Sequence, residues 1–225
     1  MKILIGPTEI AGIASGLKQG FLELGVQADV VVARPHPFGY EGLQHGGLNG
    51  LWQLVGLLRN RYASRVIGVF FDLTHGVLKW LVFFRALFVY DAFIFLFSKT
   101  LTNTRFELMS LRLLRKRIIF IYVGSDVRPP YMGAIGQTYE PTSRASDRLM
   151  RRTRDVKQRV ALHERFADYI VNSPSTAQFQ EHRFINWFSM GVPRHFTVDM
   201  AAQESHSTFV RILHAPSKPL TKGTP

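Results

Sequence analysis

The sequence predicts an α/β fold in which helices cover both faces of a doubly wound, mostly parallel sheet. Short apolar runs alternate with amphipathic or polar segments over the first 196 residues. This alternation is typical of parallel strands that are joined by crossover helices. Hydrophobic residues make up 46% of the 225 residues, which is enough to form a sizeable core.

The N-terminal segment predicts one complete βαβ unit. Residues 2–6 form a short apolar run that reads as a buried strand. A turn follows, and then residues 13–24 carry apolar side chains at helical spacing until Gly25 ends the helix. Residues 28–33 form a second strand. We expect the connection between the two strands to be right-handed.

A long apolar tract over residues 66–97 predicts a helix and then a strand. A loop over residues 34–50, rich in Gly, Pro and His, and a helix over 51–62 precede the tract. Its last twenty residues could span a bilayer by length, but Lys79, Arg85 and Asp91 interrupt them. Because each mid-span charge costs roughly 2.5–3.5 kcal/mol on insertion scales, we prefer a helix to about residue 90 and a buried strand over 92–97.

The second half of the chain continues the alternation and then changes character. It predicts, in order, a helix over 108–117, a strand over 118–123, a basic helix over 146–166, a strand over 169–172, a helix that starts at Pro174 and a strand over 184–188. We interpret residues 1–196 as a single Rossmann-like domain and the polar residues 197–208 as a linker. Residues 209–225 open with a fresh strand that no helix covers, so we expect a truncated second domain there.

The composition limits the kinds of site that the chain can hold. The sequence contains no cysteine, which excludes disulfides and thiolate chemistry and suits a cytoplasmic protein. Its eight histidines form no metal-binding spacing, so we predict no metal site. A net charge of +12 points to anionic lipid headgroups, nucleic acid or phosphorylated substrates as partners, or simply to a solvated basic surface.

The basic helix concentrates this charge. We expect five of its residues to contact an anionic surface: Arg148, Arg151, Arg152, Lys157 and Arg159. The alternative is a solvated outer helix. Nucleic acid is disfavoured as the partner because the chain lacks basic–aromatic interleaving and nucleic-acid-binding motifs.

Two loops that follow predicted strands could carry chemistry, since ligands of doubly wound sheets bind outside the carboxyl ends of the strands. The first turn contains Gly12 but matches neither a dinucleotide fingerprint nor a P-loop. Its backbone N–H groups could face a phosphate, or the turn could simply require small residues. In the loop Gly124-Ser125-Asp126, beside Arg128, the carboxylate could accept a proton from a sugar hydroxyl. It could equally cap the turn or pair with Arg128.

In order and spacing, these segments resemble the N-terminal domain of GT-B-fold, family-4-like (group 1) bacterial glycosyltransferases. The resemblance is carried by four runs: Lys2-Ile3-Leu4-Ile5-Gly6-Pro7, Tyr90-Asp91-Ala92-Phe93-Ile94-Phe95, Arg115-Lys116-Arg117-Ile118-Ile119-Phe120 leading into Gly124-Ser125-Asp126-Val127-Arg128, and Ala167-Asp168-Tyr169-Ile170-Val171-Asn172-Ser173. The run Arg211-Ile212-Leu213-His214-Ala215-Pro216-Ser217 looks like the opening of the second domain in that family. One departure is Val123, where such enzymes often carry histidine.

The resemblance implies transfer of a hexose from a nucleotide sugar to a saccharide or lipid-linked acceptor, in cell-surface polysaccharide synthesis. It assigns a catalytic role to Asp126 and acceptor binding to Gly124, Ser125 and Arg128. Gly12 and Lys222 would contact the donor diphosphate, and the nucleotide sugar is the substrate, with no further cofactor. We expect a cytoplasmic protein, with a peripheral position on the inner face of the membrane as a further possibility. We expect this fragment to be inactive alone.

The alternative function is that of a non-catalytic module with the same fold. Such a module would bind an anionic membrane surface or a nucleotide without catalysing transfer. It would use the basic helix rather than the loop at residues 124–128.

Overall fold

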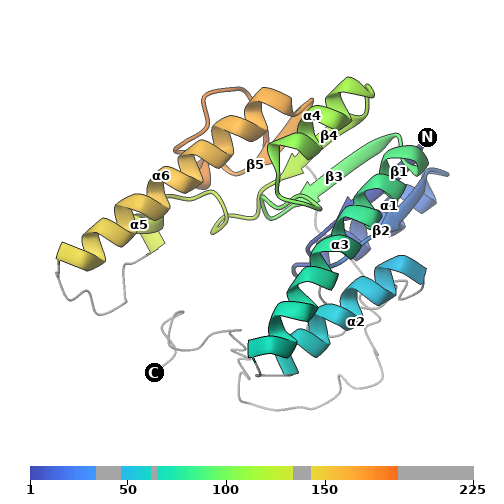
Figure 1. Cartoon of the computed structure of the whole chain (residues 1–225). Helices are drawn as coiled ribbons and strands as arrows, with labels where there is room; N and C mark the ends of the chain where they lie inside the picture. Colours follow the sequence, from blue (N-terminus) through green and yellow to red (C-terminus); the bar gives the residue numbers. More distant parts are fainter. Residues whose placement is uncertain (34–46, 62–64, 134–142, 187–225) are drawn as a thin grey trace, which may run out of the picture.

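Six parallel strands form one sheet in the order β2-β1-β3-β4-β5-β6 (Figure 1). They are β1 (Lys2–Gly6), β2 (Gln27–Val30), β3 (Ala92–Leu96), β4 (Arg117–Ile121), β5 (Tyr169–Asn172) and β6 (Ile185–Asn186). The structure is a computed structural model that describes residues 1–33, 47–61, 65–133 and 143–186. The predicted linker over 197–208, the predicted second domain over 209–225 and Lys222 lie outside these residues.

Helices cover both faces of the sheet, as the sequence predicts for a Rossmann-like fold. Helix α1 (Ile13–Glu23) packs on one face through Ala14, Leu17 and Phe21. The opposite face carries α3 (Arg65–Val89), α4 (Arg105–Leu113) and α6 (Ser143–Phe166), which share one core cluster. The remaining helical elements of the described residues are α2 (Gly47–Arg61), which packs against α3, the short α5 (Pro130–Gly133) and the 3-10 turn η1 (Pro174–Thr176).

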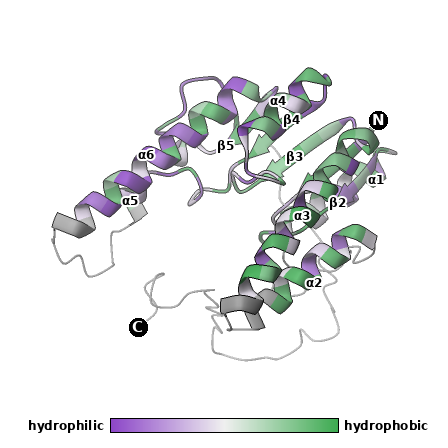
Figure 2. Cartoon of the chain, in the orientation of Figure 1, coloured by the Kyte–Doolittle hydropathy of each residue, from purple (hydrophilic) through white to green (hydrophobic). Residues whose placement is uncertain are grey.

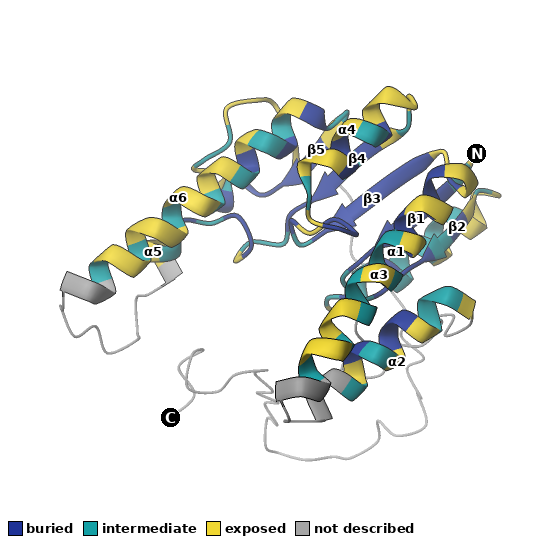
Figure 3. Cartoon of the chain, viewed as in Figure 1, coloured by how far each residue is buried: buried dark blue, intermediate teal, exposed yellow. Residues whose placement is uncertain are grey.

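Alternation of side chains along the strands separates two hydrophobic clusters. In β3, Phe93 and Phe95 face the helices α3, α4 and α6, whereas Ile94 and Leu96 face the α1 side. Successive side chains of a strand point to opposite faces, and here both faces are covered. All five β3 residues are therefore buried, which explains why the strand reads as an uninterrupted apolar run (Figure 3).

The long apolar tract folds as the predicted helix and strand, α3 and β3. Two of the three charges that interrupt the tract have local partners. The Lys79 ammonium donates to the Thr102 carbonyl at 2.9 Å, and the Asp91 carboxylate accepts from the Lys2 N–H at 2.8 Å. Among the described residues, no helix has both the length and the apolar character needed to cross a bilayer.

Helix boundaries differ from the sequence prediction where a cap decides them. Helix α4 starts at Arg105, three residues earlier than predicted, because the Thr104 hydroxyl accepts the Glu107 N–H at 3.3 Å. It ends at Leu113, shortly before Arg115 takes a positive φ of 54°. The predicted helix from Pro174 is only the short turn η1.

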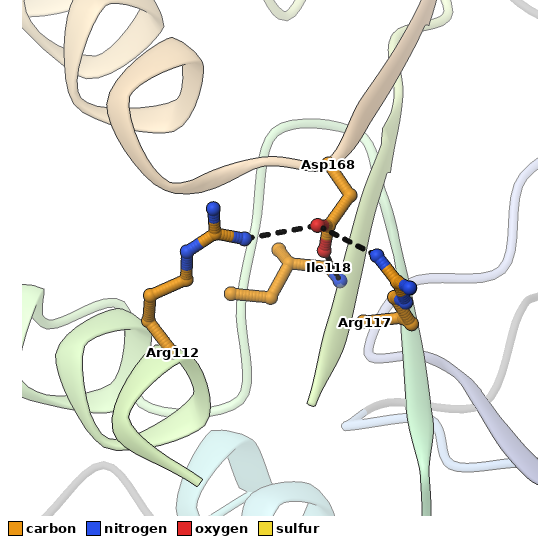
Figure 4. A network of polar contacts seen from close by, with 4 residues as sticks. All are labelled: Arg112, Arg117, Ile118 and Asp168. Carbon is orange, nitrogen blue, oxygen red and sulfur yellow. Dashed lines mark hydrogen bonds and ion pairs between the residues drawn. The ribbon is translucent and has the colours of Figure 1, made fainter. Parts of the chain in front are cut away.

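One carboxylate at the amino edge of the sheet joins β4, β5 and α4 (Figure 4). Asp168 accepts the Ile118 N–H at 2.8 Å and forms ion pairs with Arg112 at 2.9 Å and Arg117 at 3.3 Å. Burial opposes ionisation of Asp168, but the hydrogen bonds from Ile118 and Arg112 and the two positive charges together hold its pKa below the usual value. This network lies at the opposite end of the strands from the loops predicted to carry chemistry.

Candidate functional site

The candidate site lies at the carboxyl edge of the sheet, beside its topological switch point. The chain passes from β1 outward to β2 and then returns across β1 to β3, so β1 and β3 are neighbours. Loops that leave such neighbouring strands in opposite directions open a crevice, in which ligands of doubly wound sheets bind. The loops after β1, β3 and β4 all lie at this edge of the sheet.

A glycine is required where the first loop begins. A Cβ atom on Gly6 would lie 1.9 Å from the Val31 carbonyl oxygen, so the backbone after β1 passes too close to β2 for any side chain. Gly12, the predicted phosphate contact, precedes the first turn of α1 with a positive φ of 76°. The small-residue interpretation of this turn is therefore confirmed at both glycines.

A carboxylate already occupies the start of α1. The Glu9 side chain is buried, with 3% of its surface exposed. It accepts the Ala14 N–H at 3.3 Å and both the N–H and the hydroxyl of Ser15, at 3.0 and 2.9 Å. These are the N–H groups that would hold a phosphate at a helix N-terminus. An incoming phosphate at Gly12 must therefore compete with Glu9.

The sequence analysis did not single out Glu9. An acidic residue just before the first helical turn is a recognisable signal for capping, because a carboxylate is stabilised at the positive end of a helix. The long reach from Glu9 to Ser15 depends on the loop conformation, however, and spacing alone does not reveal it.

The loop after β3 holds two consecutive residues in the left-handed region. Phe97 has φ 58° and Ser98 has φ 48°. Neither is a glycine, so each is strained, and such strain concentrates at functional sites. Ser98 is buried, and its hydroxyl donates to the Asp126 carbonyl at 3.4 Å. The strained loop after β3 therefore contacts the loop after β4.

A second buried carboxylate, Glu107, organises the rest of the β3–α4 loop. It is fully buried and accepts hydrogen bonds from the Thr100 hydroxyl, the Leu101 N–H and both the N–H and hydroxyl of Thr102, at 2.6 to 2.9 Å. Burial raises the pKa of Glu107, while these hydrogen bonds oppose the increase. Both oxygens of the Glu107 carboxyl group accept hydrogen bonds from the loop, so Glu107 has a structural role.

Only one oxygen of the Asp126 carboxyl group is hydrogen-bonded within the described residues. Its Oδ1 atom accepts the Gly124 N–H at 2.9 Å and the Val123 N–H at 3.1 Å. Gly124 has φ 121°, which allows both N–H groups to converge on one oxygen. The Oδ2 atom is buried and has no hydrogen-bond partner among the described residues. The capping interpretation of Asp126 is confirmed, and it accounts for only one of the two oxygens.

The environment of Asp126 favours its protonated form more than water does. Burial raises the pKa of this carboxyl, and the hydrogen bonds from Val123 and Gly124 and the charge of Arg159 only partly oppose the increase. A buried carboxylate with a free oxygen and a raised pKa is suited to accepting a proton or a hydroxyl hydrogen bond from a ligand.

The other predicted residues of this loop have different positions. Ser125 is exposed at the tip of the turn, and Arg128 is partly buried, with its N–H bonded to the Gly124 carbonyl at 2.9 Å. Asp126 and Arg128 do not form an ion pair in the described structure. Gly124, Ser125 and Asp126 are thus brought together, and Arg128 lies in the next turn of the same loop.

Arg159 belongs to this edge, apart from the other predicted cations of α6. Its guanidinium donates to the Asp126 carbonyl at 3.1 Å, while its Nε atom is buried without a partner among the described residues. Arg148, Arg151, Arg152 and Lys157 are exposed along α6. Four of the five predicted surface cations therefore face solvent, and the fifth supports the loop at Asp126.

A neutral histidine closes the buried side of the site. His163 stacks on Phe120 with a centroid distance of 3.9 Å and shares a 3.0 Å hydrogen bond with the Tyr122 hydroxyl. Burial and the charge of Arg159 lower the pKa of His163 to about 3. The ring is therefore uncharged at neutral pH and packs as part of the core. Within the described residues, no cluster of three or more His, Asp or Glu residues could hold a metal ion.

No family model, curated protein or solved structure matches this chain.

Proposed function

We propose that this chain forms the acceptor-binding half of a glycosyltransferase, which transfers a hexose from a nucleotide sugar to a hydroxyl group of a saccharide or lipid-linked acceptor. The observation that carries the proposal is the Asp126 carboxyl group. One of its oxygens is fixed by two backbone N–H groups, and the other is buried at the carboxyl edge beside the switch point, with no partner among the described residues.

The chemistry of transfer needs an acceptor for one proton. The acceptor oxygen forms a bond to the anomeric carbon while the bond from that carbon to the nucleoside diphosphate breaks. The hydroxyl proton passes to a base, and the diphosphate leaves with the electron pair. Asp126 Oδ2 is the atom that we assign to the hydroxyl hydrogen bond, and its raised pKa favours proton uptake.

Access to Asp126 requires a local rearrangement. The Oδ2 atom has almost no solvent-exposed surface, so an acceptor hydroxyl reaches it only if the 124–128 loop opens. Gly124 provides a backbone that can change conformation without the cost of a Cβ atom. We therefore assign the exposed Ser125 to the first contact with the acceptor and Arg128 to a polar contact in the same loop.

Charge on the departing diphosphate must also be stabilised. Glu9 now holds the N–H groups of Ala14 and Ser15, so a donor phosphate near Gly12 would have to displace that carboxylate. In the proposal Lys222 supplies the point charge on the diphosphate, as the sequence resemblance implies. The start of α1 becomes available only when Glu9 is released.

Binding is the appropriate test for this chain, because we expect the fragment to be inactive alone. Isothermal titration of the purified 225-residue chain against a panel of neutral oligosaccharides, with nucleotide sugars titrated separately, should give saturable binding of a saccharide. A chain that binds a dinucleotide but neither a saccharide nor a nucleotide sugar would contradict the proposal and favour the nucleotide-binding alternative.

A further inference from the structure

Helix α3 carries a continuous apolar stripe on the side that faces away from the sheet. Six residues at spacings of three or four positions form it, and 45–83% of the surface of each is exposed: Phe70, Leu73, Val77, Leu81, Phe84 and Phe88. The opposite side of the same helix packs into the core through Val82, Phe83, Ala86 and Leu87. An amphipathic helix needs only one apolar side to pack against a sheet, so folding does not explain the stripe.

Helix α4 extends the apolar surface. Its exposed residues Phe106, Met109 and Leu113 follow the same helical spacing and are 55%, 50% and 83% exposed. Trp80 joins the two helices, because it stacks on Phe84 and lies 5.8 Å from Phe106 between ring centroids. We call the α3 stripe and these three α4 residues, with Trp80, the apolar face. Figure 2 shows the hydrophobic character of α3.

Clustering of large apolar side chains on this scale is unusual for a solvated surface. Isolated exposed leucines occur on every protein, but here two neighbouring helices align their exposed apolar residues. The α3 stripe alone runs for about 27 Å, from residue 70 to residue 88 at 1.5 Å per residue. A surface of this length and composition matches a partner that is itself extended and apolar.

Positive charge lies on the two helices of the apolar face and on α6, which contacts α4. Helix α6 packs on the same face of the sheet and contains eight arginine and lysine residues against three acidic ones. Arg151, Arg152, Arg154 and Lys157 are exposed on it, and Arg85 and Arg105 are exposed on α3 and α4. Figure 2 shows many hydrophilic residues along α6, which contacts α4 and lies apart from the hydrophobic α3.

This charge distribution selects the partner. A second copy of the chain would bring the same cations to the interface, and the net charge of each copy is +12. The positive charges near the two apolar faces would therefore repel one another. An anionic bilayer satisfies both features, since apolar side chains enter the headgroup region while lysine and arginine contact acidic lipids. We propose that the apolar face, flanked by the cations of α6, docks this chain on an anionic lipid surface.

The proposal stands independently of the proposed transferase function. It uses no residue of the carboxyl edge, so the saccharide-binding experiment neither supports nor weakens it. It also assigns the insertion to α3 and α4, whereas the membrane contact expected from the sequence was electrostatic and used the basic helix.

Vesicle flotation of the full chain tests the inference. The expected result is binding to mixed phosphatidylcholine–phosphatidylglycerol vesicles that weakens with added salt, and weak binding to phosphatidylcholine alone. The double variant Phe84→Ser/Phe88→Ser should lower the partition coefficient at least about tenfold, because two apolar side chains no longer leave water. The matched control is Leu22→Ser/Leu24→Ser, at positions that are 52% and 77% exposed at the end of α1, and it should bind as the wild type does.

An independent measurement avoids any effect of substitution on folding. Trp80 lies within the apolar face, so brominated lipids should quench part of the tryptophan fluorescence of the wild-type chain. That part should disappear in Trp80→Phe. Unchanged vesicle binding of Phe84→Ser/Phe88→Ser overturns the proposal, and so does equal binding to neutral vesicles. A different result would show that a second copy covers the apolar face. In that case the wild type would not bind vesicles and would form a concentration-dependent dimer, which Phe84→Ser/Phe88→Ser would lack.

Discussion

The Gly124 N–H donates to Oδ1 of Asp126 at 2.9 Å, while Oδ2 of the same carboxyl group is buried and has no partner in the part of the chain that the structure describes. The two oxygens therefore have different environments. Oδ1 fixes the turn after β4, and in the proposed function Oδ2 binds the acceptor hydroxyl. A substitution that preserves the first oxygen and changes the second can separate folding from function.

Asp126→Asn is that substitution. The asparagine oxygen can still accept the Val123 and Gly124 N–H groups, so we expect the variant to be as thermally stable as the wild type at neutral pH, or more stable. Burial raises the folded pKa of Asp126 above its ordinary value of 3.8. The wild type therefore loses stability as the pH rises through the window between 3.8 and the raised value.

The asparagine variant should lack this part of the pH dependence. Thermal unfolding of both proteins between pH 3.5 and neutral pH measures the difference. Parallel pH profiles would show that Asp126 does not titrate in this window, and the assigned environment would then be wrong.

Glu9→Gln should free the start of α1 for an anion. The change removes the negative charge from the Ala14 and Ser15 N–H groups, and loss of a charged cap typically costs about 1 kcal/mol of stability. We expect a lower unfolding temperature and a stronger affinity for pyrophosphate, measured by calorimetric titration. Gln19→Glu, on the exposed side of α1, would serve as a charge-changing control. Equal pyrophosphate affinity in Glu9→Gln and the wild type would mean that Glu9 does not block an anion site at the start of α1.

Asp168→Asn should destabilise the fold without affecting the carboxyl edge. Its carboxylate holds β4, β5 and α4 together through Ile118, Arg112 and Arg117, and we expect a loss of about 2 kcal/mol at neutral pH. The folded pKa of Asp168 is depressed, so its contribution is complete well above pH 3.8 and is lost as the pH falls through the lower folded value. Urea unfolding at neutral and acidic pH provides the comparison. A variant whose deficit is equally large at both pH values would rule out this ionic contribution.

Two glycine substitutions with opposite expectations test the backbone geometry at β1. Gly6→Ala places a Cβ atom 1.9 Å from the Val31 carbonyl, so we expect a loss of more than about 2 kcal/mol. Gly20→Ala lies within α1 with no atom within 4 Å of the added Cβ, and it should gain up to about 1 kcal/mol from helix propensity. Denaturant unfolding measures both, and a tolerated Gly6→Ala would contradict the described path of β1 against β2.

The sequence predicted most of the architecture because buried parallel strands leave a strong local signal. The run from Ala92 to Leu96 is apolar throughout, since both faces of the central sheet are covered. The basic helix was also predicted nearly in full, because its charge pattern is continuous over α6. Boundaries that depend on one cap were less accurate, as at Thr104, whose hydroxyl starts α4 three residues early.

The site was predicted only where its residues are close in sequence. Gly124, Ser125 and Asp126 form one turn, and the possibility that Asp126 caps it could be stated from the sequence. The contacts from Ser98 and Arg159 to the Asp126 carbonyl join three separate elements, and no local pattern reveals them. Likewise, the exposed apolar face became evident only when the structure showed which side of α3 packs on the sheet.

The most direct test of the proposed function compares saccharide binding by the wild type, Asp126→Asn and the control Asp155→Asn, whose carboxylate is exposed on α6. Calorimetric titration with the best-binding saccharide measures all three. The proposal predicts that Asp126→Asn binds at least about tenfold more weakly, a loss expected for one hydrogen bond to a charged group, while it melts at or above the wild-type temperature and Asp155→Asn binds normally. Equal affinities for all three proteins would show that Asp126 does not contact the acceptor, and the acceptor-binding function assigned to this edge would be wrong.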